Sequence, residues 1–342
     1  MIGMDGISIH RSLHVARAAM ELSAPFRISG YVFNAMPSIV VHIEEGGYKG
    51  RGEAAGVYYV GDDQDRMVET VESVRALVEG GIGRDDLQLA LPPCGARNAI
   101  DCALWELESR RLGKPVWELA GVPEPQPLVS TFTLPAEDPA ILADLVRTLD
   151  FAKAIKLKLD GDLAADAERL AVVRAARPDA WLGVDANQGF ASDQLDRLEA
   201  ILIEHSVALL EQPTPRGQES ALAGWRPPFP VAADESILDL TELGEKAAYF
   251  DVINIKLDKC GGLTEALTMA RAARSMGKQV MVGNMGGSTL AMAPGFVLAQ
   301  LCDVVDLDGP ANLADDALAD SIYSDGRIFV PEEMWGATTV RS

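Results

Sequence analysis

The chain has 342 residues, of which 48% are hydrophobic and 24% charged, a composition typical of a globular protein that buries its core without disulfide staples. Asp and Glu number 51 against 30 Lys and Arg, which gives a net charge of -21. This balance argues against binding to nucleic acid or to an anionic membrane surface, because both require a basic face.

The cysteines and the longest uncharged stretch concern the compartment. Cys94, Cys102, Cys260 and Cys302 form no C-x-x-C pair, and no secretory segment is found at the N-terminus. We therefore expect a reduced, cytoplasmic protein. Residues 279–302 carry no charge, but their glycines, proline and polar residues would break a membrane helix. This segment predicts a buried strand, a glycine turn and a core helix instead.

The first 120 residues or so predict an α+β unit. Residues 37–53 alternate apolar and polar side chains around a Gly-Gly turn, which indicates an antiparallel hairpin. Residues 62–78 and 96–112 place apolar side chains at helical spacing, and Gly113 and Pro115 end the second stretch. Residues 315–342 lack a strand–helix pattern and are expected to return to this unit. We predict a capping domain over residues 1–122 that is completed by residues 314–342.

Residues 123–313 alternate short β-branched runs with longer connectors. Eight strands are predicted, at residues 128–134, 154–159, 181–185, 208–211, 230–234, 252–257, 279–283 and 304–307, with helices such as 163–176, 192–204 and 263–276 between them. This alternation predicts a parallel sheet, and eight repeats favour closure into a barrel. A doubly wound open sheet is the competing fold, and the absence of a G-x-G-x-x-G motif in the first unit speaks against it.

Charged residues end six of the eight predicted strands, at the edge where a βα-barrel carries its active site. Asp185, Glu211 and Asp234 end three successive strands, so their carboxylates should converge. Three carboxylates suit Mg²⁺, whereas zinc does not fit because none of the four histidines falls on a strand end. The alternative is that the three are solvated loop acids.

Three of the nine lysines fall on predicted barrel strands: Lys156, Lys158 and Lys256. Lys156 and Lys158 share one face of a strand, and Lys256 lies on the strand across the barrel. Crowding of cations beside Mg²⁺ should lower the pKa of a lysine toward the range that is useful for proton transfer. Two such amines could act as a proton donor and acceptor pair. The alternative is that the lysines only neutralise the acids.

Six short motifs run through most of the chain, at residues 99–107 (AIDCALWEL), 156–158 (KLK), 185–188 (DANQ), 211–213 (EQP), 233–236 (ADES) and 254–262 (NIKLDKCGG). In this order and spacing they resemble the enolase superfamily, and within it the muconate-lactonizing-enzyme-like subgroup. The resemblance implies an α+β capping domain over a (β/α)7β modified TIM barrel, with one Mg²⁺ stabilising an enediolate. It implies that Lys158 and Lys256 remove and return the α-proton on opposite faces, and that Lys156 contacts the substrate and supports its charge. Asn187 and Glu235 would support the metal ligands.

The substrate is indicated by Asp306 and Asp308, which alternation points the same way on the last strand. This D-x-D resembles the dipeptide epimerases of the subgroup, where it holds the α-ammonium of the dipeptide. The implied activity is a 1,1-proton transfer that inverts the C-terminal residue of an L,L-dipeptide. The alternatives on this scaffold are muconate cycloisomerase, o-succinylbenzoate synthase and N-succinylamino acid racemase. A catalytically silent, metal-dependent solute receptor is the alternative from another class, and loop acids without a ligand are the alternative reading of the D-x-D.

The cap segments 29–36 and 52–59 are expected to select the substrate side chain. Members that act on Ala-Glu tend to carry an Arg a few residues after the Pro-Phe of the cap. Here Tyr31 stands at that place and Arg27 comes earlier, which speaks against specificity for a C-terminal Glu. Tyr31 is therefore predicted to bind substrate. Barrel enzymes often assemble symmetrically, so a homo-oligomer is compatible with the sequence.

Overall fold

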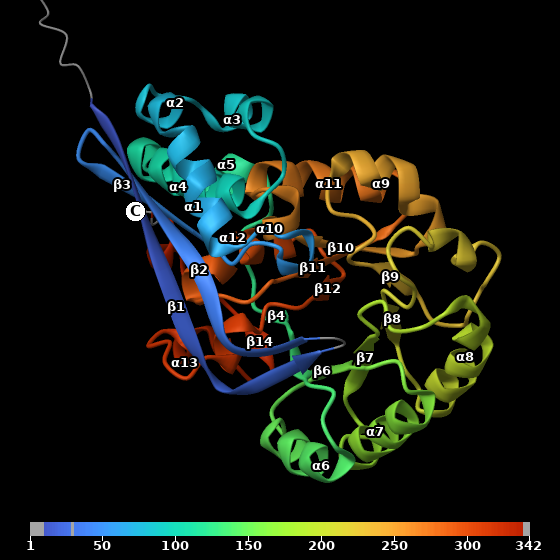
Figure 1. Ribbon diagram of the computed structural model, residues 1–342. Coiled ribbons are helices and arrows are strands. Elements are labelled where there is room, and N and C mark those ends of the chain that lie inside the picture. Colours follow the sequence, from blue (N-terminus) through green and yellow to red (C-terminus); the bar gives the residue numbers. More distant parts are fainter. Residues whose placement is uncertain (1–9, 29–30, 338–342) are drawn as a thin grey trace, which may run out of the picture.

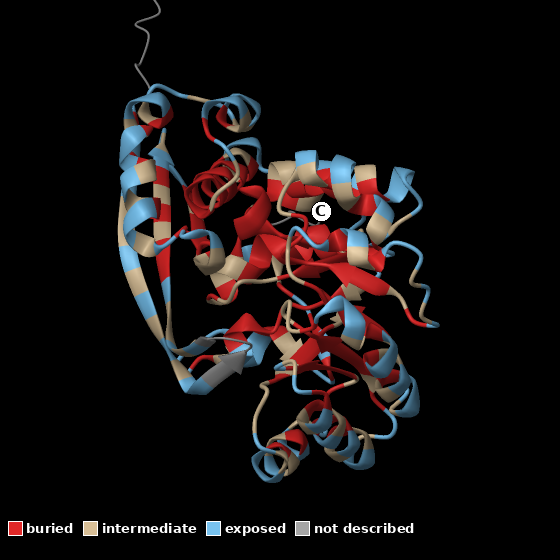
Figure 2. Ribbon diagram, turned by 45° about the vertical axis from the view of Figure 1, so that its right-hand side comes forward, coloured by how far each residue is buried: buried red, intermediate tan, exposed pale blue. Residues whose placement is uncertain are grey.

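The computed structural model describes residues 10–28 and 31–337, and the side chains of residues 26–28 and 31 also lie outside the description. An N-terminal cap of strands and helices stands against a ring of parallel strands with helices around it (Figure 1). Buried residues gather in the ring strands and where the cap meets them, while the outer helices turn one face to solvent (Figure 2). No helix within the described ranges has the length and apolar character needed to cross a membrane.

A long antiparallel ribbon forms the outer wall of the cap. Within the described residues its sheet contains β1 (Arg11–Ile28), β2 (Tyr31–Glu45) and β3 (Tyr48–Ala54), in that order. The predicted hairpin at residues 37–53 is confirmed, with Gly46 and Gly47 at positive φ in the turn between β2 and β3. The sequence does not predict β1, because its many alanines and arginines leave only a weak apolar–polar alternation.

The cap helices follow the ribbon. They are α1 (Gln64–Ser73), α2 (Arg75–Glu79), α3 (Arg84–Ala90), α4 (Gly95–Leu112) and α5 (Val116–Ala120). The single helix predicted at residues 62–78 is wrong in one respect, since Val74 leaves the helical conformation and separates α1 from α2. The helix predicted at residues 96–112 is α4, and Gly113 ends it in the left-handed conformation, with φ 63°.

Helix α4 packs closely on β3. A Cβ atom added to Gly52 would lie 2.1 Å from the backbone oxygen of Ala99, and one added to Gly50 would lie 1.9 Å from that of Ala103. Glycine is therefore required at both positions for the helix to approach the strand. This close contact fixes the ribbon relative to the barrel, because α4 also packs on α10 and α11.

The barrel is one parallel sheet whose described strands run in sequential order. They are β5 (Thr131–Leu134), β6 (Ala154–Lys158), β7 (Trp181–Asp185), β8 (Leu209–Glu211), β9 (Val231–Ala233), β10 (Val252–Lys256), β11 (Gln279–Gly283) and β12 (Val304–Val305). The predictions for β7 and β11 match residue for residue. The order has no reversal, which excludes the doubly wound alternative.

The first predicted strand, residues 128–134, is wrong at its start. Leu128 and Val129 form a separate strand, β4 (Leu128–Val129), which pairs antiparallel with β14 (Arg327–Ile328). Side chains then join β12 to β5 and close the ring. Ser130 Oγ accepts from the Leu307 N–H at 3.1 Å, and Asp308 Oδ2 accepts from the Thr133 N–H at 2.7 Å.

Helices α6 (Pro139–Thr148), α7 (Leu163–Ala176), α8 (Leu195–Glu204), α9 (Leu240–Lys246), α10 (Leu257–Cys260), α11 (Leu263–Ser275) and α12 (Thr289–Ala299) cover the outside of the barrel. The helices predicted at residues 163–176 and 263–276 are α7 and α11, and the one at 192–204 is a 3-10 turn, η2 (Ser192–Gln194), followed by α8. The connector between β8 and β9 has the length expected for a helix, but it forms only a 3-10 turn, η3 (Glu219–Leu222). The uncharged stretch at residues 279–302 is β11 and α12, as predicted.

The C-terminal tail first lies against the barrel and then reaches the cap. It contains η5 (Gly309–Asn312), α13 (Ala319–Ile322), β13 (Tyr323–Ser324), β14 and η6 (Glu332–Met334). The Trp335 indole donates to the Arg51 backbone oxygen at 3.0 Å, and Trp117 Nε1 donates to Glu332 at 2.8 Å. Through these two contacts the end of the described tail reaches residues of the N-terminal unit.

Candidate active site

The inner face of the barrel changes from apolar to charged along the strands. Near the strand starts, a small buried cluster fills the interior: Leu209, Ala232, Val252 and Met281. Side chains two residues apart share a face of a strand, so Glu211 and Asp234 continue this inner face one step toward the carboxyl edge. The cluster therefore forms an apolar floor, and the charged residues lie above it at the mouth of the barrel.

Asp185, Glu211 and Asp234 come together as the sequence predicts. One carboxylate oxygen from each residue lies within 4.8 Å of those from the other two, and all three side chains are buried. Asn254, two residues before Lys256 on β10, donates to Glu211 Oε1 at 2.8 Å. Three convergent carboxylates in this geometry could hold one metal ion.

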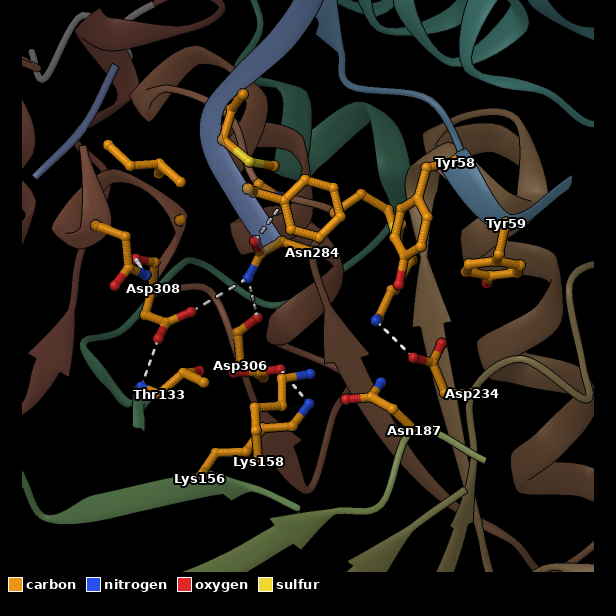
Figure 3. Close-up of a pocket in the computed structure, with 18 of the residues that line it drawn as sticks. Tyr58, Tyr59, Thr133, Lys156, Lys158, Asn187, Asp234, Asn284, Asp306 and Asp308 are labelled. Carbon is orange, nitrogen blue, oxygen red and sulfur yellow. Dashed lines mark hydrogen bonds and ion pairs between the residues drawn. The ribbon is translucent and has the colours of Figure 1, made fainter. Parts of the chain in front are cut away.

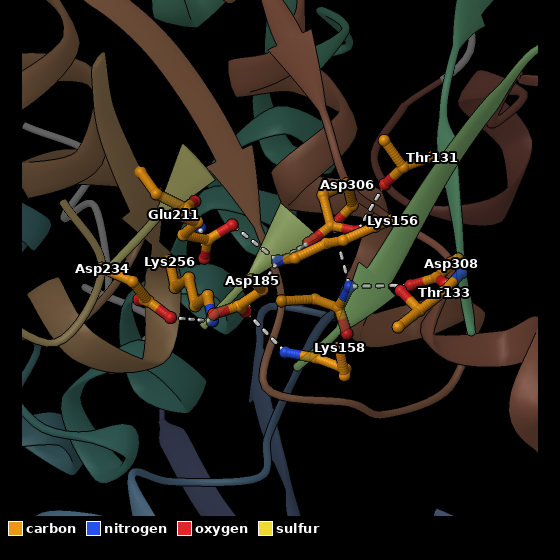
Figure 4. Close-up of polar contacts among 12 residues, drawn as sticks. Thr131, Thr133, Lys156, Lys158, Asp185, Glu211, Asp234, Lys256, Asp306 and Asp308 are labelled. Atoms are coloured by element: carbon orange, nitrogen blue, oxygen red, sulfur yellow. Dashed lines mark hydrogen bonds and ion pairs between the residues drawn. The ribbon is translucent and has the colours of Figure 1, made fainter. Parts of the chain in front are cut away.

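The three predicted lysines also reach this triad (Figure 4). Lys158 Nζ lies 2.6 Å from Asp185 Oδ2, and Lys256 Nζ lies 2.6 Å from Asp234 Oδ2. Because β6 and β10 are separated by three strands of the ring, the two amines approach from opposite sides of the barrel. Lys156 Nζ lies 2.7 Å from Glu211 Oε2 and 3.2 Å from Asp185 Oδ2.

The carboxylates govern the charge of the lysines. Burial alone would lower the pKa of Lys156, but the negative charges of Asp306, Glu211 and Asp185 outweigh burial and hold that pKa well above its usual value. For Lys256 burial is likewise outweighed, first by Asp234, and the pKa is raised. The acids thus act against the lowering expected from a neighbouring cation, so both amines are ammonium groups when the carboxylates alone surround them.

A fourth lysine, Lys259 on α10, belongs to the same layer. Its Nζ donates to Asp234 Oδ1 at 2.7 Å and to the backbone oxygens of Asp234 and Asn254 at 2.7 and 2.9 Å. Lys259 therefore fixes one carboxylate oxygen of Asp234, while the other oxygen faces Lys256.

Asp306 and Asp308 both line the cavity, as alternation predicts. Asp306 accepts from Thr131 Oγ1 at 2.6 Å and from Lys156 Nζ at 2.9 Å, and the lysine keeps the pKa of Asp306 below its ordinary value in spite of burial. Burial and the neighbouring Asp306 raise the pKa of Asp308. An ammonium group placed beside Asp308 would relieve this unfavourable burial of negative charge.

Asn187 and Glu235 lie next to the triad. Asn187 adopts φ 40°, which is uncommon for a residue with a side chain, and its Nδ2 donates to Glu235 Oε1 at 3.3 Å. The Asn187 N–H donates to Asp185 Oδ1 at 2.9 Å. Burial, together with Asp234 and Asp185, raises the pKa of Glu235 to about 8. Asn187 thus contacts the triad directly and Glu235 contacts Asn187, and their support of the metal ligands stays a prediction.

The donor set fits a divalent cation. Among the described residues, six buried carboxylates and four buried lysines meet here: Asp185, Glu211, Asp234, Glu235, Asp306, Asp308, Lys156, Lys158, Lys256 and Lys259. When all are ionised they leave two negative charges, the amount that one Mg²⁺ neutralises. Asn187 Oδ1 and Glu235 Oε2 are buried and accept no hydrogen bond from the described chain, as expected for oxygens that face a hydrated cation or a substrate.

A cavity opens above the charged layer, with an empty volume of about 790 Å³ that includes part of its open mouth. In Figure 3, Tyr58 and Tyr59 lie on the side of Asp234, and Asn284, Asp306 and Asp308 lie on the other. Phe33 and Met36 line the cavity as well, so both cap segments expected to select the side chain reach it. Tyr31 begins β2, but its side chain is outside the described residues, so its predicted role stays a prediction.

Two family models match this chain in sequence. Residues 10–121 match the N-terminal domain of the mandelate racemase/muconate lactonizing enzyme family, and residues 141–334 match the enolase C-terminal domain-like family. The chain belongs to this family of the enolase superfamily.

Curated relatives within the family are epimerases and racemases by name. L-Ala-D/L-Glu epimerase of Escherichia coli is 37% identical and matches 90% of this chain and 95% of its own length. N-acetyl-D-glutamate racemase of a Pseudoalteromonas species is 36% identical over 72% of this chain and 78% of its own. Hydrophobic dipeptide epimerase of Roseobacter litoralis is 33% identical over 91% and 94%.

Solved structures of the family superimpose closely. An Agrobacterium tumefaciens enolase family member with homology to dipeptide epimerases, holding sodium and L-Ala-L-Glu, has a TM-score of 0.89 at 34% identity and covers 95% of this chain and 100% of its own. The dipeptide epimerase of Methylococcus capsulatus, complexed with Mg and L-Arg-D-Lys, has a TM-score of 0.84 at 27% identity and covers 96% and 98%.

Several side chains of the site are not predicted from the sequence. Thr131 and Thr133 hold Asp306 and Asp308, and the period of two along β5 could have indicated that both face the last strand. Asn254 could have been found in the same way, two residues before Lys256. Asn284, which donates to the Asp306 backbone oxygen at 2.8 Å, follows β11 without a charge to mark it.

Proposed function

We propose that this chain is a Mg²⁺-dependent dipeptide epimerase that inverts the α-carbon of the C-terminal residue of an L,L-dipeptide. One observation carries the proposal: a single cavity is lined at one end by Asp234 of the carboxylate triad with Lys158 and Lys256, and at the other by a pair of acids, Asp306 and Asp308. The first part suits an α-carboxylate and its neighbouring C–H, and the second suits an ammonium group. A dipeptide carries both groups. The names of the relatives and the Mg-bound dipeptide complex from Methylococcus capsulatus support this choice.

Asp185, Glu211 and Asp234 would hold the Mg²⁺, with Asn187 and Glu235 keeping them in place. When bound, the ion draws electron density from the substrate carboxylate and makes the adjacent α-C–H more acidic. The buried triad excludes bulk water from the ligands, and Lys259 orients Asp234 by binding one of its carboxylate oxygens.

The two flanking lysines carry the proton. A neutral Lys158 Nζ accepts the proton from one face of the α-carbon, and the electron pair left behind delocalises into the carboxylate. The Lys256 ammonium then donates a proton to the opposite face, which inverts the carbon. The two lysines end with exchanged protonation states, so the reverse reaction uses the same groups. Lys156, close to the triad and to Asp306, contacts the carboxylate end of the substrate and supports its charge.

The remaining assignments are part of the same proposal. Asp306 and Asp308 bind the α-ammonium of the dipeptide, and Tyr31 of the cap contacts the substrate. The cap comprises residues 1–122 and 314–342, and the catalytic barrel comprises residues 123–313. Contacts such as that of Trp335 with Arg51 support this division. The free thiols of the four cysteines suit a cytoplasmic location, and a homo-oligomer remains compatible with the fold.

The test is proton NMR of L-Ala-L-Xaa dipeptides in D₂O, with N-acetyl and N-succinyl amino acids in parallel. We expect loss of the C-terminal α-proton signal and the appearance of the epimer with dipeptides, and loss of both effects in EDTA. Exchange confined to the N-acyl compounds would favour the racemase alternative. Ligand binding without exchange at any α-carbon would favour a solute receptor.

A further inference from the structure

The cap supplies the uncharged wall of the cavity. Its described lining residues are Leu22 from β1, Phe33 and Met36 from β2, and Tyr58 and Tyr59 from the 3-10 turn η1 (Tyr58–Val60). Burial and the neighbouring acids raise the pKa values of both tyrosines, so the two phenols are neutral at physiological pH. The wall formed by these five side chains, which we call the cap wall, carries no charge and faces the layer of buried carboxylates and lysines.

Aromatic rings stack through the cap wall. Phe33 and Tyr58 meet edge to face with ring centroids 5.1 Å apart, and Tyr58 meets Tyr59 in the same manner at 5.2 Å. The chain of rings leads from the ribbon to the side of the cavity that holds Asp234 (Figure 3). On the other side, Met36 packs against Gly286, where an added Cβ would lie 2.1 Å from the Met36 methyl carbon.

The positions of the charged groups leave one direction for the side chain of the inverted residue. Its carboxylate points to the triad, its amide leads toward Asp306 and Asp308, and the lysines take the two faces of the α-carbon. The fourth substituent must therefore leave the barrel toward the cap. Tyr58 lines the cavity at this exit, on the side of Asp234 (Figure 3).

Charge balance disfavours an acidic side chain at this exit. The six carboxylates and four lysines of the described site are matched by one divalent cation, which leaves no surplus positive charge. A substrate γ-carboxylate at the exit would lie near Glu235 and Asp234 and would lose its hydration against aromatic rings. Placing an unpaired charge in such surroundings is unfavourable, whereas an apolar side chain gains by burial.

The geometry points to a side-chain preference: the inverted residue carries an apolar or aromatic side chain, which binds against the cap wall. The chain then epimerises L-Ala-L-Phe and L-Ala-L-Leu in preference to L-Ala-L-Glu, and Phe33 is a residue that determines this specificity. The inference rests on the proposed function, because it places the substrate by the triad and the D-x-D.

The experiment compares kcat/KM for L-Ala-L-Phe, L-Ala-L-Leu and L-Ala-L-Glu, with N-acetyl-L-Phe and N-acetyl-L-Glu in parallel. We expect the apolar dipeptides to exceed L-Ala-L-Glu by about tenfold or more. A preference for Glu over Phe would overturn the inference while leaving the epimerase function intact. Exchange confined to the N-acetyl series would overturn the proposed function, and the ratio of Phe to Glu in that series would still decide the inference. Absence of exchange from both series would overturn both.

Phe33→Arg supplies a cation at the cap wall, and Val32→Arg is its matched control. Val32 neighbours Phe33 on β2 and is 49% exposed on the other face of the ribbon. Phe33→Arg should shift the preference toward L-Ala-L-Glu by about tenfold or more, and Val32→Arg should leave the ratio within about twofold of the unmodified chain. Equal shifts in both variants would show that surface charge, not the cap wall, sets the preference. A third variant, Arg27→Ala, tests the end of β1. If the unmodified chain prefers Glu and this variant loses that preference, Arg27 determines the specificity instead of Phe33.

Discussion

Lys158 and Lys256 make an asymmetric test of the chemistry possible. Each Nζ lies 2.6 Å from a different triad carboxylate, and the two lysines come from strands on opposite sides of the ring. Each amine thus reaches only one face of a substrate α-carbon. Removing one of them should stop inversion but leave the remaining amine able to exchange the proton on its own face.

We therefore expect Lys158→Ala and Lys256→Ala each to lower the rate of epimerisation by about 10²–10⁴-fold. In D₂O, each variant should still exchange the α-proton of one epimer, and the two variants should exchange opposite epimers. Proton NMR of both epimers measures this directly. Lys153→Ala, which removes an exposed lysine next to β6, is the control and should keep full activity. Exchange of the same epimer by both variants would contradict placement on opposite faces.

Asp308 allows a separate test of ammonium recognition. Asn at this position keeps the oxygen that accepts from the Thr133 N–H at 2.7 Å but loses the negative charge. A hydrogen bond to a charged group contributes about 1.5–3 kcal/mol. Asp308→Asn should therefore lower kcat/KM for dipeptides by about 10–100-fold, mainly through KM, and should have little effect on any residual turnover of N-acyl substrates. Equal losses for both substrate types would mean that Asp308 affects activity only through its hydrogen bond with Thr133, which joins the last strand to β5.

At the scale of elements, α10 ties the cap to the catalytic strand β10. Asp258 follows Lys256 by two residues and accepts from the Gly56 N–H at 2.9 Å, just before Tyr58 in the chain. Burial, assisted by the neighbouring Asp62, raises the pKa of Asp258 to about 7 although backbone N–H groups favour its charged form. The hydrogen bond between Gly56 and Asp258, which holds the segment that carries Tyr58 and Tyr59, is therefore sensitive to pH.

The sign of this sensitivity follows from linkage. The raised pKa means that the folded chain holds a proton on Asp258 between about pH 4 and 7 that the unfolded chain has lost. The contribution of Asp258 to the free energy of unfolding is therefore present at low pH and is lost as the pH rises through 7. The loss is about 4 kcal/mol at most. Asp258→Asn removes the titration and keeps an acceptor for Gly56. Its free energy of unfolding, relative to the unmodified chain, should increase between pH 5 and pH 8 in urea titrations. The control is Asp193→Asn, at an exposed position, whose free energy of unfolding should differ from that of the unmodified chain by a constant amount. A constant difference for Asp258→Asn as well would show that the Asp258 carboxyl is solvated.

The elements differ in how far the sequence predicts them. Strands buried on both faces are continuous apolar runs bounded by helices, so β7 and β11 are predicted residue for residue. The ribbon strand β1 has one solvated face and many alanines, and neither period dominates it. The break at Val74 also has no local signal such as Gly or Pro. Strand β1 is paired with β2, and α1 packs on α4; a single sequence does not display such tertiary contacts.

The residues of the site also differ in how far the sequence predicts them. Ionisable residues at strand ends are unusual enough to be found from the sequence, and the triad, the lysines and the D-x-D come together as predicted. Asn284 lies on a loop whose course depends on the fold, and nothing in its residue type marks it as part of a site. Tyr58 falls in the predicted cap segment 52–59, but the sequence does not single it out within that segment. Lys259 is found only when the single turn of α10 brings it back to Asp234.

At the scale of the whole molecule, the net charge of -21 and the charge of the site have different consequences. The surface excess keeps like molecules apart and favours solubility. In the barrel mouth, the described carboxylates exceed the lysines by two within a buried layer, and this excess opposes folding until a cation joins it. Burial and the charge of Asp185 raise the pKa of Glu211 to about 7, which is a sign of that opposition.

Metal binding and stability should therefore be coupled, and Glu211→Gln separates the two. The amide keeps an oxygen that can accept from Asn254 and removes one charge, so in EDTA at pH 8 the variant should melt at the same temperature as the unmodified chain or higher. This advantage should vanish toward pH 5, because Glu211 then takes up a proton in the fold. Added Mg²⁺ should stabilise the unmodified chain by about 2.7 kcal/mol at 100 times its Kd, and the variant much less. Melting curves across both pH values and Mg²⁺ concentrations measure this, with the exposed Glu69→Gln as control. An equal Mg²⁺ shift in the unmodified chain and in Glu211→Gln would place the ion elsewhere.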